Sequence, residues 1–151
     1  MLLVADVHGA NEALARVARS GEPLLVLGDL LDLFEYRSGE GLMVQLVGRE
    51  RVLEFLRRRE GDPDAGRSAW RAYEAAHREE VAARFDRLVG EAYARVAEAL
   101  EGAEAYVTYG NTDRPDLLRE CLPPGARFLD GEVVEVEGLR VGMVGGGSTY
   151  P

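Results

Sequence analysis

Four side chains with metal-binding chemistry lie in three short motifs of this chain. The motifs read Asp-Val-His-Gly from residue 6, Gly-Asp-Leu-Leu-Asp from residue 28 and Gly-Asn-Thr-Asp from residue 110. Their candidate ligands are Asp6, His8, Asp29 and Asn111. Carboxylates, an imidazole and an amide oxygen are ligands for divalent metal ions, and a shared carboxylate can bridge two of them. The residue types therefore predict a metal site.

Each motif follows an apolar run that reads as a buried strand, over residues 2–5, 24–27 and 106–109. In an open α/β sheet, ligands bind beyond the carboxyl ends of the strands, so three neighbouring strand ends would gather the candidate ligands. Asp6 and His8 are two residues apart, and in extended backbone such residues point to the same side. Taken alone, each motif also has a structural interpretation, namely a polar turn with His8 as a helix cap or Asn111 in a left-handed turn.

Between the second and third motifs, the sequence predicts two helices, over 41–60 and 66–101, around a turn at 61–66. The second helix carries an apolar stripe at steps of three and four residues, which is typical of a helix that faces a core. The stripe consists of Trp70, Tyr73, His77, Val81, Phe85, Leu88, Ala92, Tyr93, Val96 and Leu100. We expect His77 to be a core or interface histidine. Strands are expected again from residue 103, with a hairpin formed by 132–137 and 140–144.

The three motifs resemble those of the calcineurin-like metallophosphoesterase superfamily. That family is marked in order by D-x-H, G-D-x-x-D, G-N-x-[DE], a later lone His and a final G-H-x-H. The last two motifs are absent, since His8 and His77 are the only histidines. The resemblance covers residues 1–38 and 103–151. It implies an α/β fold, the N-terminal half of a two-sheet α/β/β/α sandwich, as a single domain over 1–151 with a long helical insertion at about 39–102.

The resemblance implies hydrolysis of a phosphomonoester or phosphodiester by a hydroxide that a dinuclear metal centre activates. The cofactors would be two divalent ions, from among manganese, iron, zinc, nickel and magnesium. The resemblance makes Asp6, His8, Asp29 and Asn111 the metal ligands and makes Asp29 the carboxylate that both ions share. Asp32 is expected to orient a ligand, although capping a turn is an equally good interpretation.

Two residues of the third motif and its flank are expected to be catalytic. Asp113 would orient a neighbour or shuttle a proton. Arg114 would contact a substrate phosphate, whose oxygens match the guanidinium fork, or would be an ordinary surface arginine. Thr112 stands where many family members carry a histidine, and its hydroxyl has too high a pKa to act as a general acid.

The missing histidines lead us to expect impaired activity, because each ion would lack part of the family's ligand set. The chain would then be either a fragment, whose remainder supplies the ligands, or a degenerate member. The alternative function is a catalytically inactive scaffold that docks proteins through the helical insertion. The presence of all four ligand types argues against that alternative.

The composition limits the partners that we expect. The 151 residues carry a net charge of −9, which argues against a nucleic-acid partner but not against a small phosphorylated substrate at a metal site. The single cysteine, Cys121, excludes an intrachain disulfide and fits a reducing compartment. We find no signal peptide or membrane span, so we expect a cytoplasmic protein. A homo-oligomer is as compatible with the sequence as a monomer.

Overall fold

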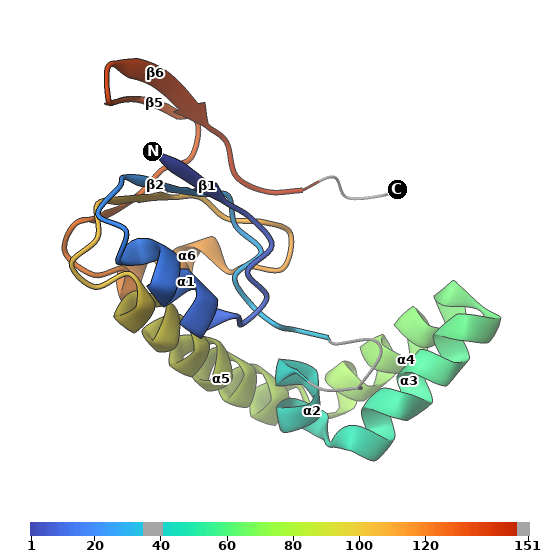
Figure 1. The fold of residues 1–151 in the computed structure, drawn as a ribbon. Helices are drawn as coiled ribbons and strands as arrows, with labels where there is room; N and C mark the ends of the chain where they lie inside the picture. Colours follow the sequence, from blue (N-terminus) through green and yellow to red (C-terminus); the bar gives the residue numbers. More distant parts are fainter. Residues whose placement is uncertain (35–40, 148–151) are drawn as a thin grey trace. The chain divides into compact units, whose positions relative to one another are not determined.

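A computed structural model describes residues 1–34 and 41–147 of this mixed α/β protein (Figure 1). The chain divides into two compact units. The α/β unit comprises Met1–Asp32 and the described residues from Gly90 onward, and the helical unit comprises the described part of Leu33–Val89. No helix in the described ranges has both the length and the apolar character needed to cross a membrane.

The centre of the α/β unit is a parallel sheet of four short strands in the order β1-β2-β3-β4. The strands are β1 (Leu2–Val4), β2 (Leu24–Val26), β3 (Ala105–Val107) and β4 (Ala126–Phe128). The predicted strands before the three motifs are confirmed, each shortened and the third starting one residue earlier. Because β1, β2 and β3 are parallel neighbours, the motifs that follow them leave the sheet at the same edge.

The predicted hairpin is confirmed as β5 (Glu132–Val136) paired antiparallel with β6 (Leu139–Met143). Its inward side chains pack with residues of the parallel sheet in one apolar cluster, which contains Leu25, Tyr106, Leu129, Val134, Val136 and Met143. In β5, Val134 and Val136 face this cluster while Val133 and Glu135 are exposed, so one face of the strand is buried and the other is solvated. Two further helices, α1 (Asn11–Ala18) and α6 (Pro115–Cys121), connect strands of the parallel sheet.

The region predicted as two helices contains four. They are α2 (Leu42–Val47), α3 (Arg49–Gly61), α4 (Pro63–Ala76) and α5 (Arg78–Ala99), and α3 and α4 lie side by side (Figure 1). The predicted helix over 41–60 breaks at Gly48, where φ is +86°, a backbone conformation that glycine tolerates. The predicted turn at 61–66 reduces to Asp62, whose carboxylate caps α4 by accepting a hydrogen bond from the N–H of Asp64 at 2.9 Å.

The predicted helix over 66–101 was wrong in its continuity, because the chain leaves the helical conformation at His77. The expectation of a core histidine is also wrong. His77 is exposed and stacks on Tyr73, with a ring-centroid distance of 4.3 Å, while its Nδ1 lies 2.9 Å from the Tyr73 carbonyl oxygen. The stripe on α5 is confirmed by burial of Val81, Leu88, Ala92, Tyr93 and Val96, followed by Leu100. The other large members, Trp70, Tyr73 and Phe85, are half-buried.

Candidate functional site

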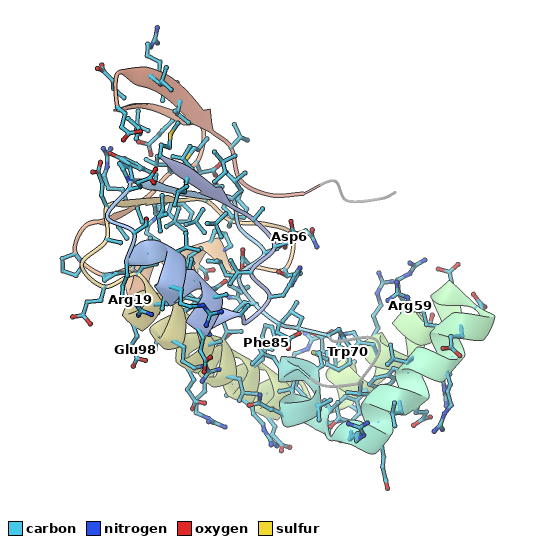
Figure 2. The ribbon with its side chains drawn as sticks, in the orientation of Figure 1. Asp6, Arg19, Arg59, Trp70, Phe85 and Glu98 are labelled. Carbon is cyan, nitrogen blue, oxygen red and sulfur yellow. The ribbon has the colours of Figure 1, made fainter. Side chains whose placement is uncertain are left out.

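The loops that follow β1 and β2 are joined by backbone hydrogen bonds. The N–H of His8 donates to the carbonyl of Asp29 at 2.9 Å, and the N–H of Gly9 donates to the carbonyl of Leu30 at 3.0 Å. Asp6, labelled in Figure 2, lies just beyond the end of β1 in the same loop as His8. The first two motifs are therefore held directly beside each other.

The third motif packs against the second without room for additional side chains. A Cβ added at Gly28 would overlap the backbone of Gly110, and one added at Gly110 would overlap the carboxylate of Asp29. Thr112 completes the contact, because its N–H and its hydroxyl both donate to Oδ1 of Asp29, at 3.0 and 2.8 Å. Only glycine fits at positions 28 and 110, because the two strand-end loops approach each other too closely for a side chain.

Three of the four candidate ligands have a backbone conformation that is rare for residues with a side chain. The φ angles of Asp6, His8 and Asp29 are +53°, +41° and +51°. The only other non-glycine residue with positive φ in the described chain is Glu137, in the hairpin turn. Such conformations cost free energy and cluster at ligand-binding sites, where the surrounding structure enforces them.

The side chains of Asp6 and His8 lie close together, as the sequence predicts, although not by way of extended backbone. The distance from Nε2 of His8 to Oδ1 of Asp6 is 3.7 Å, and both side chains are exposed. Nδ1 of His8 lies 3.2 Å from the carbonyl oxygen of Leu31. Because a carbonyl can only accept, this contact assigns the proton of the neutral ring to Nδ1 and leaves a lone pair on Nε2. This tautomer is the one that a histidine needs in order to bind a metal ion through Nε2.

Asp113 is a buried carboxylate that holds the loops together. Its oxygens accept hydrogen bonds from the N–H groups of Leu30 at 3.0 Å and Leu31 at 3.3 Å, and from that of Gly110 at 2.9 Å. They also accept one from the hydroxyl of Tyr93 at 3.3 Å. Burial raises the pKa of Asp113, while the three backbone donors act in the opposite direction. These contacts keep the carboxylate within the protein, and the catalytic role of Asp113, in orienting a neighbour or in shuttling a proton, remains a prediction.

The remaining predicted residues lie at the margin of this arrangement. Asn111 is exposed, and the backbone of Gly147 passes so close that a Cβ there would lie 2.8 Å from the Cβ of Asn111. The guanidinium of Arg114 is 3.2 Å from Oδ2 of Asp116. The half-buried side chain of Asp32 packs beside Gly9. The substrate-binding role of Arg114 and the orienting role of Asp32 remain predictions.

The donor chemistry suits a divalent ion, although the side chains do not form a closed cage. Within the described ranges, no group of three or more His, Cys, Asp or Glu side chains is gathered in a geometry that could hold a metal. Oδ1 of Asp29 receives both bonds from Thr112, which leaves Oδ2 as the oxygen for a further ligand. With Nε2 of His8 and the exposed carboxylate of Asp6, the site offers oxygen and nitrogen donors of the type that such ions take.

Sequence reasoning missed the parts played by Tyr93 and Thr112. Tyr93 was expected only as a core residue of the helical stripe, and Thr112 only as a departure from the family pattern. The sequence offered only a general indication for Tyr93, namely that a buried tyrosine hydroxyl usually has a hydrogen-bond partner.

The chain matches no family model, no curated protein and no solved structure.

Proposed function

We propose that this chain carries the metal site of a phosphoesterase, a hydrolase that acts on a phosphomonoester or a phosphodiester. The observation that carries the proposal is the joining of all three motifs through Asp29. The carbonyl of Asp29 accepts from His8 of the first motif, and its carboxylate accepts from Thr112 of the third. The positive φ angles at Asp6, His8 and Asp29 support the same interpretation.

In this proposal, Asp6, His8, Asp29 and Asn111 hold two divalent ions, and manganese is the ion to test first. Bound ions of this class supply a hydroxide near neutral pH and neutralise charge on phosphoryl oxygens. The protein contributes orientation: the Leu31 carbonyl sets the tautomer of His8, and Thr112 fixes the carboxylate of Asp29. The cations also explain how a chain with a net charge of −9 could bind a phosphorylated substrate.

The small number of candidate ligands limits the activity that we expect of the 151-residue chain. Four candidate ligands do not complete the coordination of two ions, and loss of coordinating or supporting groups commonly costs about 10–100-fold each in metal affinity or activity. We therefore expect weak Mn²⁺ binding and little or no hydrolysis of an aryl phosphodiester by this chain. Full-rate, metal-dependent hydrolysis would contradict the expectation of impairment, while supporting the reaction class.

The test is a calorimetric Mn²⁺ titration of wild type and Asp29→Asn, with Asp64→Asn as the matched control. Asparagine keeps an oxygen that can accept from Thr112, so the fold should survive while the ligand charge is lost. Asp64 is an exposed carboxylate of α4, in the helical unit. We expect Asp29→Asn to weaken Mn²⁺ binding by about tenfold or more, and Asp64→Asn to leave it unchanged.

Two results would overturn the proposal. One is the absence of Mn²⁺ binding by wild type, and the other is equal affinity of wild type and Asp29→Asn. Either result would make the protein-docking scaffold the better account. Circular dichroism of both variants must accompany the titrations, because only a folded Asp29→Asn protein reports on the ligand.

A further inference from the structure

We infer that Tyr93 is a positioning residue of the metal site, whose hydroxyl fixes the loops that carry His8, Asp29 and Asn111. The inference rests on the proposed function. It concerns a residue outside all three motifs, since Tyr93 lies on α5. In this inference, α5 contributes a positioning residue to the site in addition to its apolar packing.

The hydroxyl of Tyr93 makes two hydrogen bonds, both to the segment after β3. It donates to Oδ1 of Asp113 at 3.3 Å and accepts from the backbone N–H of Arg114 at 2.7 Å. The tyrosine is fully buried, with none of its surface exposed. Two contacts to adjacent residues from one rigid ring determine where this segment lies relative to α5.

Asp113 transmits this constraint to the loop after β2. The carboxylate that accepts from Tyr93 also accepts from the N–H groups of Leu30, Leu31 and Gly110. The carbonyl of Leu31 in turn faces Nδ1 of His8 at 3.2 Å. A continuous hydrogen-bonded path therefore leads from Tyr93 through Asp113 and Leu31 to the imidazole.

The same carboxylate also acts on the third motif. Gly110, whose N–H it binds, immediately precedes Asn111, and Thr112 with its two bonds to Asp29 follows. Removing the Tyr93 hydroxyl would thus loosen the loops after β2 and β3 at the Asp113 carboxylate, to which both are hydrogen-bonded. Burial, and then the nearby Asp113 carboxylate, raise the pKa of Tyr93, which keeps its hydroxyl protonated and able to donate at neutral pH.

The chain offers a matched control in Tyr106. Tyr106 is also a buried tyrosine, but its hydroxyl donates to Glu104 at 2.7 Å, outside the three motifs. Tyr93→Phe removes one oxygen with the two hydrogen bonds that it makes, and Tyr106→Phe removes one oxygen with one hydrogen bond. A difference between the two variants in metal binding would therefore report on position, because a loss of packing or stability alone affects both.

The experiment is a calorimetric Mn²⁺ titration of wild type and both variants, well below their melting temperatures. Tyr93→Phe is expected to weaken Mn²⁺ binding about tenfold, as loss of a supporting group does, while Tyr106→Phe keeps the wild-type affinity. Wild-type affinity in a folded Tyr93→Phe protein would overturn the inference and leave the proposed function standing. If wild type itself binds no Mn²⁺, the proposed function fails and the inference fails with it.

Amide hydrogen exchange in the metal-free protein provides a second measurement. In Tyr93→Phe, the amides of Leu31, Gly110 and Arg114 should exchange faster than in wild type, and in Tyr106→Phe they should not. Unchanged exchange at these amides in Tyr93→Phe would overturn the positioning role, whatever the titrations show.

Discussion

Thr112 donates two hydrogen bonds to a single oxygen of Asp29, although the two residues are 83 positions apart in the chain. The backbone N–H lies 3.0 Å and the hydroxyl 2.8 Å from Oδ1. A carboxylate held by two donors at one oxygen cannot rotate freely, and its second oxygen remains for another ligand. Thr112 therefore serves the site as a hydrogen-bond donor, which does not require a titratable side chain.

Replacing Thr112 by valine should weaken Mn²⁺ binding about tenfold, because the carboxylate of Asp29 loses its side-chain support. The free energy of unfolding should fall by about 1 kcal/mol, the usual net value of one hydrogen bond. Thr108→Val is the control, since the hydroxyl of Thr108 is buried and has no hydrogen-bond partner within the described structure. That variant should keep or raise stability. Similar results for both variants in titration and urea unfolding would contradict the role of Thr112.

Asp113→Asn should destabilise the α/β unit by about 3 kcal/mol, because the amide cannot accept all the bonds that the carboxylate accepts and leaves buried donors unpaired. Asp116→Asn changes an exposed carboxylate three residues away and should have little effect. Urea denaturation followed by circular dichroism measures both. A difference near zero between the two variants would show that the Asp113 network contributes nothing to stability.

Gly28→Ala should destabilise the protein by about 3 kcal/mol or more, because its φ of +90° is strained for alanine and the new Cβ would overlap Gly110. Gly90→Ala should do the reverse. Gly90 lies within α5, a Cβ there meets nothing within 4 Å, and alanine stabilises a helix interior by about 0.5–1 kcal/mol relative to glycine. Melting temperatures that move in the same direction would refute the steric argument.

Phe55→Leu should loosen the aromatic cluster of the helical unit. The Phe55 ring makes edge contacts with Trp70 at 5.6 Å and Tyr73 at 6.2 Å between centroids, each worth about 0.5–1.5 kcal/mol beyond burial. Trp70 is the only tryptophan, so its fluorescence reports on this cluster. We expect a red-shifted emission in Phe55→Leu. Phe128→Leu, which alters the stack on Tyr109 instead, should leave the emission of folded protein as in wild type.

The sequence alone determined the strands before the motifs, the 132–144 hairpin and the apolar face of α5. These features follow from local periodicity, which depends only on which residues are neighbours along the chain. The same information was not enough to place the helix breaks at Gly48 and His77. A long run of helix-forming residues does not reveal where the chain changes direction.

Tertiary structure decided how the candidate site is assembled. The partners of Asp113 come from the loop after β2, from α5 and from the third motif. The bond from Leu30 to Asp113 and the bond from Thr112 to Asp29 each span 83 positions in the sequence. Hydrogen bonds between residues so far apart arise only after the strands have paired, because pairing is what brings their carboxyl ends together. The sequence could therefore name the types of the candidate ligands, whereas the hydrogen bonds that Tyr93 and Thr112 make to these loops could be recognised only in the folded chain.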